Sequence, residues 1–348
     1  MSPLILAVIL PALILGTTIT LASSHWLIAW VGLELNTLAI LPLMTRQPHP
    51  RAVEATIKYF LIQAAAAATL LFAATTNAWL TGQWEIQQMI HPVPTAIATL
   101  ALAMKIGLAP THFWLPEVLQ GLDLTTGLIL STWQKLAPFA LLLQIPHHNQ
   151  ALLMTLGALS TLVGGWGGLN QTQLRKILAY SSIAHLGWMT LVLPFSPSIS
   201  LMTLILYFIM SFSTFIVFKV NNSTNINGLA ISWAKSPALS AITPLILLSL
   251  GGLPPLSGFM PKWLILTELT KQGLALMATV AALSALLSLY FYLRLSYMMT
   301  LTMSSNTVMG PSPWRLPTEQ ATLPLATTTM ATIALLPVTP LVFSLFTP

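Results

Sequence analysis

The segments MKIGLAPTHFWLPE, Met104 to Glu117, and LGGLPPLSGFMPKW, Leu250 to Trp263, decide the fold of this chain. Each places Gly-Leu-X-Pro inside an apolar run, with a second proline six residues after the first. Proline removes a backbone donor and clashes with the preceding turn, so both segments predict discontinuous helices. In lipid such a break persists only where it packs inside protein or lines a polar cavity.

The composition makes lipid the main solvent of this chain. Of its 348 residues 55% are hydrophobic and only 6% are charged, whereas soluble domains carry roughly a quarter charged residues. The apolar runs are about twenty residues long, which matches a hydrocarbon core of ~30 Å. We therefore predict an all-α integral membrane protein with about eleven transmembrane helices. The predicted helices are 3–21, 25–44, 54–79, 95–121, 124–144, 150–170, 174–193, 199–220, 238–271, 274–300 and 322–346.

The two breaks lie five predicted helices apart, in the fourth and the ninth helix. An odd number of crossings reverses direction, so the single transmembrane domain 1–348 is predicted to contain two inverted five-helix repeats. These repeats are 1–148 and 149–300, and 322–346 is an extra helix. Paired broken helices in inverted repeats are typical of secondary transporters, whose ion path lies near the bilayer midplane. Glycine and proline are also common in membrane helices, but two matched positions favour the transporter-like interpretation.

Four charged residues are predicted at the depth of the membrane centre: Glu34, Lys105, Lys135 and Lys262. Each would cost ~2.5–3.5 kcal/mol if it faced lipid, so all four must face the bundle, pair or hydrate. One carboxylate cannot neutralise three ammonium groups, and a desolvated lysine exchanges its proton more readily. We predict that the four carry protons; the alternative is a buried ion pair that only fixes packing.

Two histidines are further, weaker candidates for the same relay. His112 follows the first break and His185 lies midway along the seventh predicted helix, where we expect it to match Glu34 of the first repeat. An ordinary imidazole titrates near pH ~6.5, although a lone histidine is more often a structural hydrogen-bonding residue. Glu54 and Lys58 have the i,i+4 spacing of an interfacial salt bridge.

Several other classes of function are excluded by composition. The chain has no cysteine, so it has no zinc–thiolate or ordinary cysteine-ligated iron–sulfur site. Its seven histidines are dispersed, and we predict no metal and no redox cofactor in this chain. The net charge is +6, but the basic residues are scattered, which argues against nucleic-acid binding.

The basic residues are distributed asymmetrically if the predicted helices alternate in direction. The opposite face receives little beyond Lys271, so the basic face is expected on the side of synthesis, which is the matrix if the protein is mitochondrial. This predicts an N-terminus in the matrix and a C-terminus in the intermembrane space. The basic face receives Arg46, Arg51, Arg175, Lys176, Lys219, Lys235, Arg294 and Arg315.

Taken together, the motifs resemble those of the proton-translocating, antiporter-like subunits of respiratory complex I. The resemblance rests on Met104 to Glu117, WQKLAP from Trp133 to Pro138, LRKILAYSSIAHLG from Leu174 to Gly187, and LGGLPPLSGF from Leu250 to Phe259. It extends over essentially the whole chain. It implies a subunit of the mitochondrial inner membrane that moves protons while other subunits pass electrons from NADH to ubiquinone.

The resemblance also implies roles and neighbours. The family's glutamate–lysine pair maps onto Glu34 and Lys105, its bridging lysine onto Lys135 and its outlet lysine onto Lys262. FMN, iron–sulfur clusters and ubiquinone would belong to other subunits. Larger family members have fourteen helices, and the resemblance implies that this chain corresponds to the last eleven of them. The implied neighbours are chain 4, the small chain 4L with chain 6 near it, accessory subunits, and lipids such as cardiolipin.

Two rival functions share part of this pattern. A cation/proton antiporter subunit of the same ancestry would need the same lysines, although the motif forms argue against it. A non-pumping scaffold subunit would tolerate neutral residues in place of the central lysines.

Overall fold

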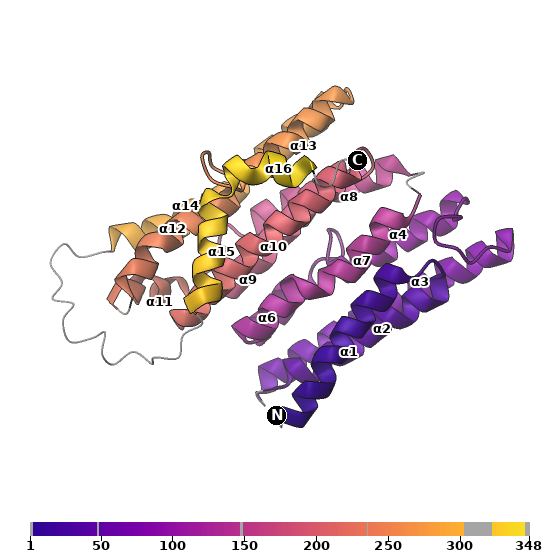
Figure 1. Cartoon of the computed structure of the whole chain (residues 1–348), viewed down its shortest axis with the longest axis horizontal. Coiled ribbons are helices and arrows are strands. Elements are labelled where there is room, and N and C mark those ends of the chain that lie inside the picture. Colours follow the sequence, from indigo (N-terminus) through magenta and orange to yellow (C-terminus); the bar gives the residue numbers. More distant parts are fainter. Residues whose placement is uncertain (1–2, 47–48, 147–148, 235, 303–321, 345–348) are drawn as a thin grey trace. The chain divides into compact units, whose positions relative to one another are not determined.

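The computed structural model describes residues 3–46, 49–146, 149–234, 236–302 and 322–344. These residues form helices and no β-strand, and the chain divides into two compact units, Met1–Leu156 and Gly157–Pro348. Figure 1 shows the helices coloured along the chain. Within the described ranges, five helices are long and apolar enough to span a membrane: Ile5–Ala22, Trp26–Met44, Pro50–Thr81, Pro197–Val220 and Ala275–Leu301.

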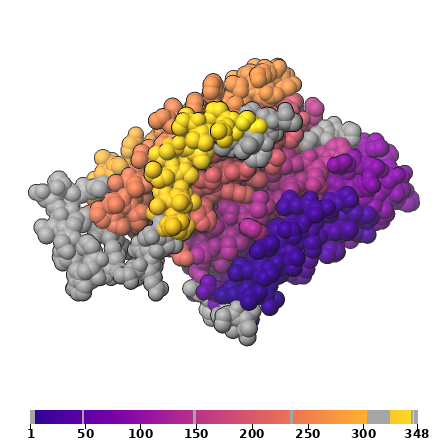
Figure 2. Space-filling view, viewed as in Figure 1, coloured from indigo at the N-terminus to yellow at the C-terminus, as the bar shows by residue number. Residues whose placement is uncertain are grey.

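The first unit is a bundle in which sequential helices pack side by side. Helix α1 packs on α2, α2 on α3, and α3 on both α4 and α5, while α4 also packs on α7. Figure 2 shows α1 in indigo at the surface of this unit, where apolar side chains such as Val8 and Leu15 are exposed, as lipid contact requires. Its helices are α1 Pro3–Ala22, α2 Trp26–Met44, α3 Pro50–Thr81, α4 Pro92–Ile106, α5 Trp114–Gly121, α6 Leu124–Ser131, α7 Trp133–Gln144 and the start of α8 Gln150–Gly167.

The run 95–121 is interrupted at its glycine. Helix α4 ends at Ile106 because Gly107 takes a left-handed conformation (φ 86°), which glycine adopts without a Cβ penalty. Helix α5 begins only at Trp114, and the peptide bond before Pro110 is cis. Two neighbouring side chains satisfy the terminal carbonyls of α4. The Trp114 indole donates to Met104 O (3.2 Å) and the Gln63 amide to Lys105 O (3.3 Å).

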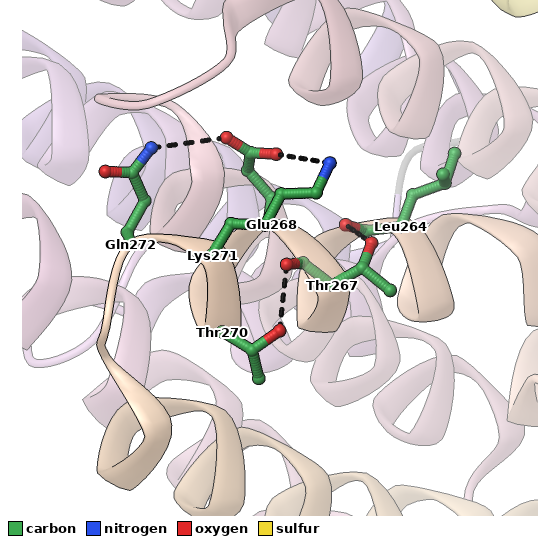
Figure 3. Close-up of polar contacts among 6 residues, drawn as sticks. All are labelled: Leu264, Thr267, Glu268, Thr270, Lys271 and Gln272. Atoms are coloured by element: carbon green, nitrogen blue, oxygen red, sulfur yellow. Dashed lines mark hydrogen bonds and ion pairs between the residues drawn. The ribbon is translucent and has the colours of Figure 1, made fainter.

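The second unit packs α9 on α10, α10 on α12 and α15, and α12 on α14. Its helix α13 buries Ile265 and Leu269 in an apolar core shared with α9 and α14. At the polar end of α13, Glu268 lies 3.8 Å from Lys271 and accepts from Gln272 (3.4 Å; Figure 3). Its elements are the rest of α8, α9 Leu174–Val192, α10 Pro197–Val220, α11 Ile226–Ala230, η1 Ile231–Ala234, α12 Pro237–Gly251, α13 Phe259–Lys271, α14 Ala275–Leu301, α15 Thr322–Ala334, η3 Leu336–Val338 and α16 Thr339–Ser344.

The run 238–271 is interrupted in the same way. Gly252 ends α12 in the left-handed conformation (φ 77°) and α13 begins at Phe259, while the Pro254–Pro255 bond is cis. The intervening loop is attached to α15, because the Ser257 hydroxyl donates to Thr332 O at 2.6 Å.

The prediction of one continuous helix over 124–144 is wrong. Helix α6 ends at Ser131 and α7 starts at Trp133. The hydroxyls of Ser131 and Thr132 both donate to the Leu128 carbonyl. Between the two helices Thr132 has φ −114° and ψ −71°, which departs from regular helical backbone.

The final predicted helix, 322–346, is also not continuous. Helix α15 ends at Ala334 because Pro337 has no N–H to extend it, and η3 and α16 follow; residues 345–346 lie outside the described residues. The segment 221–236, predicted as a loop, contains the short elements α11 and η1.

One isolated β-bridge occurs in each unit, just before α2 and just before α9. His25 pairs with Glu85 in the first unit, and Gln173 pairs with Asn225 in the second. Each bridge joins the start of one helix to the segment after the next helix. In both units, therefore, a bridge occupies the same place relative to its helices, and each unit also contains a broken helix.

Candidate functional site

A polar cavity lies inside the first unit, between the first half of the broken helix and its neighbours. It offers about 20 Å³ to the centre of a water molecule, and about 10–15 Å³ suffices for one water. Both Lys105 and Lys135 line it. The remaining lining residues are Leu33, Asn36, Thr37, Tyr59, Gln63, Ile106, Trp114, Leu115, Leu130, Gln134 and Pro138.

Lys105 occupies the last turn of α4, where the negative end of the helix dipole favours a cation. Its side chain is 6% exposed, and its ammonium nitrogen has no hydrogen-bond partner among the described residues. A buried ammonium left without partners costs several kcal/mol, so water in the cavity is the natural ligand.

Lys135 enters the same cavity from α7 and is 2% exposed. The neighbouring Gln134 amide donates to the Asn36 carbonyl at 3.2 Å, which ties α7 to α2. Two of the predicted proton carriers are thus brought to one cavity, although they lie in different helices.

Glu34 lies beside this cavity and does not line it. The carboxylate is half-buried in α2 and accepts a hydrogen bond from the Thr37 hydroxyl at 2.8 Å. Glu34 and Lys105 form no ion pair within 4.0 Å, both residues lying in the described part of the chain; the Glu34 charge acts on Lys105 only at longer range. The Glu34–Lys105 pair therefore stays a prediction, since the two side chains are apart in this structure.

Lys262 belongs to the second unit and has a different environment. It lies in the first turn of α13, and its ammonium donates to the carbonyl of Gly251, the last residue of α12, at 2.6 Å. A cation on the carboxyl end of a helix satisfies an orphan carbonyl and complements the helix dipole. The absence of a side chain at Gly252 makes this possible, because a Cβ there would lie 2.8 Å from Lys262 Cδ.

His185 lies in α9 with its ring 5.4 Å from that of Tyr207, whose hydroxyl is within hydrogen-bond reach of Ser182. Glu34 is nine residues after the bridging His25, and Ser182 is nine residues after the bridging Gln173. The predicted match of His185 to Glu34 stays a prediction.

His112 lies in the first break and is 4% exposed. Its Nδ1 is 3.3 Å from Pro110 O and its ring packs on Phe113, and it does not line the cavity. The geometry gives it a structural contact within the break.

The Glu54–Lys58 pair is present but has a third member. Lys58 Nζ is 2.7 Å from Glu54 and also 2.7 Å from Glu117 of α5, so the cluster joins α5, the second half of the broken helix, to α3. In the described ranges no group of three or more His, Cys, Asp or Glu side chains could hold a metal.

Several residues at the site escaped sequence reasoning: Thr37, the buried amides Asn36 and Gln63, and the half-buried amide Gln134. Thr37 could have been found from its i,i+3 spacing to Glu34. The amides carried only the signal of polar residues in apolar helices.

Sequence comparison relates this chain to known proteins. Residues 23–288 match the family described as NADH:quinone oxidoreductase/Mrp antiporter, TM, and residues 289–343 match NADH dehydrogenase subunit 2 C-terminus. The chain is 69% identical over 346 residues to NADH-ubiquinone oxidoreductase chain 2 of Tetraodon nigroviridis, covering 99% of each chain. It is 67% identical over 348 residues to the protein of that name from Salmo salar, covering 100% of each.

Solved structures agree on the fold. A chain of respiratory complex I from Thermus thermophilus is 30% identical, with a TM-score of 0.81 over 94% of this chain and 77% of that one. A chain of the Mrp complex from Dietzia sp. DQ12-45-1b is 18% identical, with a TM-score of 0.80 over 95% of this chain and 74% of that one. The latter likeness concerns the fold alone.

Proposed function

The chain belongs to the family of membrane subunits shared by NADH:quinone oxidoreductases and Mrp antiporters, and from this premise we propose that it relays protons through its buried lysines. It is an antiporter-like membrane-arm subunit of NADH–ubiquinone oxidoreductase, complex I. It is thus part of an enzyme whose other subunits are its partners.

The cavity of the first unit is the observation that carries this proposal. It brings Lys105 and Lys135 to one cavity that several polar side chains line, and the Lys105 ammonium has no hydrogen-bond partner among the described residues. Water in that space would complete the hydrogen bonds of the Lys105 ammonium and connect it to Lys135. A proton can then leave one lysine and reach the other without crossing apolar protein.

Glu34 is the proposed switch of this step. While the Thr37 hydroxyl holds the carboxylate, Lys105 lacks a direct counter-charge and releases its proton through water towards Lys135. When Glu34 leaves Thr37 and approaches Lys105, the two charged forms stabilise each other and Lys105 is reloaded. Moving a charge against the membrane potential costs ~2.3 kcal/mol per 100 mV, so redox energy from other subunits drives the cycle.

In the second unit, Lys262 is the proposed outlet. To release a proton, the Lys262 ammonium must break its hydrogen bond to the Gly251 carbonyl. This hydrogen bond stabilises the charged form of Lys262 until the two groups move apart. Ser182, Tyr207 and His185 supply the hydroxyl and imidazole groups that would hold water in this unit. His112 is a weaker relay candidate because it does not line the first cavity.

We further propose eleven crossings, arranged as two inverted five-helix repeats, 1–148 and 149–300, followed by 322–346. The matching left-handed glycines and the matching β-bridges support this. An experimental structure of the intact complex in which α1–α7 failed to overlay on α8–α14 would overturn it.

The proposed location is the mitochondrial inner membrane, with the N-terminus in the matrix and the C-terminus in the intermembrane space. The proposed neighbours are chain 4, chain 4L, chain 6, accessory subunits and lipids such as cardiolipin. Two of the basic residues behind this orientation, Lys235 and Arg315, lie outside the described residues. Labelling of Pro348-proximal residues from the matrix side of sealed vesicles would contradict it.

The decisive experiment is Lys105→Met in the fully assembled complex. Methionine keeps the length and the apolar stem but removes the titrating group, so proton transfer through the chain stops and coupled NADH oxidation slows. The measured quantities are the proton-to-electron ratio and the turnover. Wild-type values for both would refute the relay and favour the scaffold function, in which neutralising a buried unpaired charge is harmless.

A further inference from the structure

The Asn36 carboxamide is an unexplained polar group in the first unit. Its side chain is 2% exposed, and both Oδ1 and Nδ2 lack a hydrogen-bond partner among the described residues. A carboxamide offers two donors and an acceptor with two lone pairs. Buried polar groups are nearly always paired with protein or with ordered water, so a pair of orphan atoms on one side chain points to a bound polar ligand.

Asn36 lies between helix α1 and the cavity of the first unit. Helix α1 closes one side, because a Cβ added at Gly16 would lie 2.7 Å from Asn36 Oδ1. On the other side Asn36 lines the cavity that also holds Lys105 and Lys135. Its backbone carbonyl accepts from Gln134, which precedes Lys135 in α7, so the amide is fixed relative to that lysine.

We infer that Asn36 is a positioning residue of the proton path, whose carboxamide holds the water between Lys105 and Lys135. This inference rests on the proposed relay function. An amide does not titrate near neutral pH, so it can orient water as donor and acceptor without capturing the proton. In the step itself the Lys105 ammonium gives a proton to the water, which passes one to a neutral Lys135 amine. The net charge of the cavity is unchanged.

The test replaces Asn36 by leucine in the assembled complex. Asn36→Leu removes both orphan atoms, so the thermal stability of the complex stays equal or rises, whereas turnover and proton transfer fall about ten-fold or more. A merely structural residue would lower both quantities together. Asn36→Val adds less volume than leucine and serves the same test if Asn36→Leu does not assemble.

Asn77→Leu is the matched control. Asn77 is also fully buried in this unit with an unpaired Oδ1, but it does not line the cavity. It donates to Gln83 O, so its loss lowers stability while the proton-to-electron ratio stays at the wild-type value.

Lys105→Met distinguishes a failure of the Asn36 role from a failure of the lysine relay. Wild-type turnover and proton-to-electron ratio in Asn36→Leu, with Lys105→Met still blocked, would overturn the role of Asn36 and leave the relay standing. Wild-type behaviour of both variants would overturn the relay itself.

Discussion

The two helix breaks use one backbone device for two different lysines. In each, a left-handed glycine ends a half-helix, and a lysine lies at that carboxyl end. At the first break, Gln63 and Trp114 cap the carbonyls, which leaves the Lys105 ammonium to the cavity. At the second, Lys262 is itself the cap. The side chains that satisfy the helix end thus decide whether the lysine ammonium faces the cavity or binds the backbone.

This difference has an energetic consequence. Removing an unpaired buried charge is neutral or stabilising, whereas removing one partner of a charged hydrogen bond leaves the other unsatisfied. Because both lysines are proposed proton carriers, their neutral variants should lose activity alike. They should differ in stability, because only Lys262 is hydrogen-bonded to the backbone.

The largest effects are expected for the lysines themselves. Lys105→Met and Lys262→Met both abolish coupled proton transfer, but only Lys262→Met destabilises, by about 1.5–3 kcal/mol, because Gly251 loses a charged donor. Thermal inactivation of the assembled complexes, measured beside their turnover, checks both halves. Equal stability of the two variants would break the comparison.

Alanine at the glycines is expected to have the next largest effect. Gly107→Ala and Gly252→Ala each cost about 1–2 kcal/mol for the left-handed conformation. Gly252→Ala should cost more, because its Cβ would lie 3.0 Å from Lys262 Nζ, whereas that of Gly107 meets Leu115 at 3.1 Å. Unfolding temperature and activity are the measurements. A greater loss of activity in Gly107→Ala would reverse the predicted order.

A smaller effect is expected for Thr37→Val, which removes the donor that holds Glu34. The freed carboxylate would approach Lys105. Lys105 would then have a direct protein partner, as Lys262 has. If the lost hydrogen bond favours the Lys105-bound position of the Glu34 carboxylate by ~1 kcal/mol, turnover should be about five-fold slower. Thr37→Ser keeps the donor and should retain wild-type turnover; equal rates in all three proteins would remove Thr37 from the switch.

The smallest effect is expected for Glu117→Gln. Glu117 and Lys58 are both largely exposed, and ion pairs of this kind contribute little. Turnover should be unchanged, with at most a slight loss of thermal stability. A marked fall in proton pumping would place this cluster in the path.

Sequence alone indicated much of the fold because its signals are local. Apolar runs and the Gly-Leu-X-Pro motifs act through the backbone within a few residues. The break between α6 and α7 at Thr132 interrupts a run that hydropathy predicted as one helix, because hydropathy registers apolar content and not the local backbone conformation.

The sequence by itself determined that this chain lies in lipid, that two of its helices break at Gly107 and Gly252, and that lysines lie near both breaks. The tertiary structure decided which groups meet: Asn36 joins Lys105 and Lys135 at one cavity, while the Lys262 ammonium binds the Gly251 carbonyl. The physical reason is that helix formation in lipid follows from each segment's own backbone and apolar side chains. The partners of a buried charge come from helices distant in sequence and are fixed only by packing.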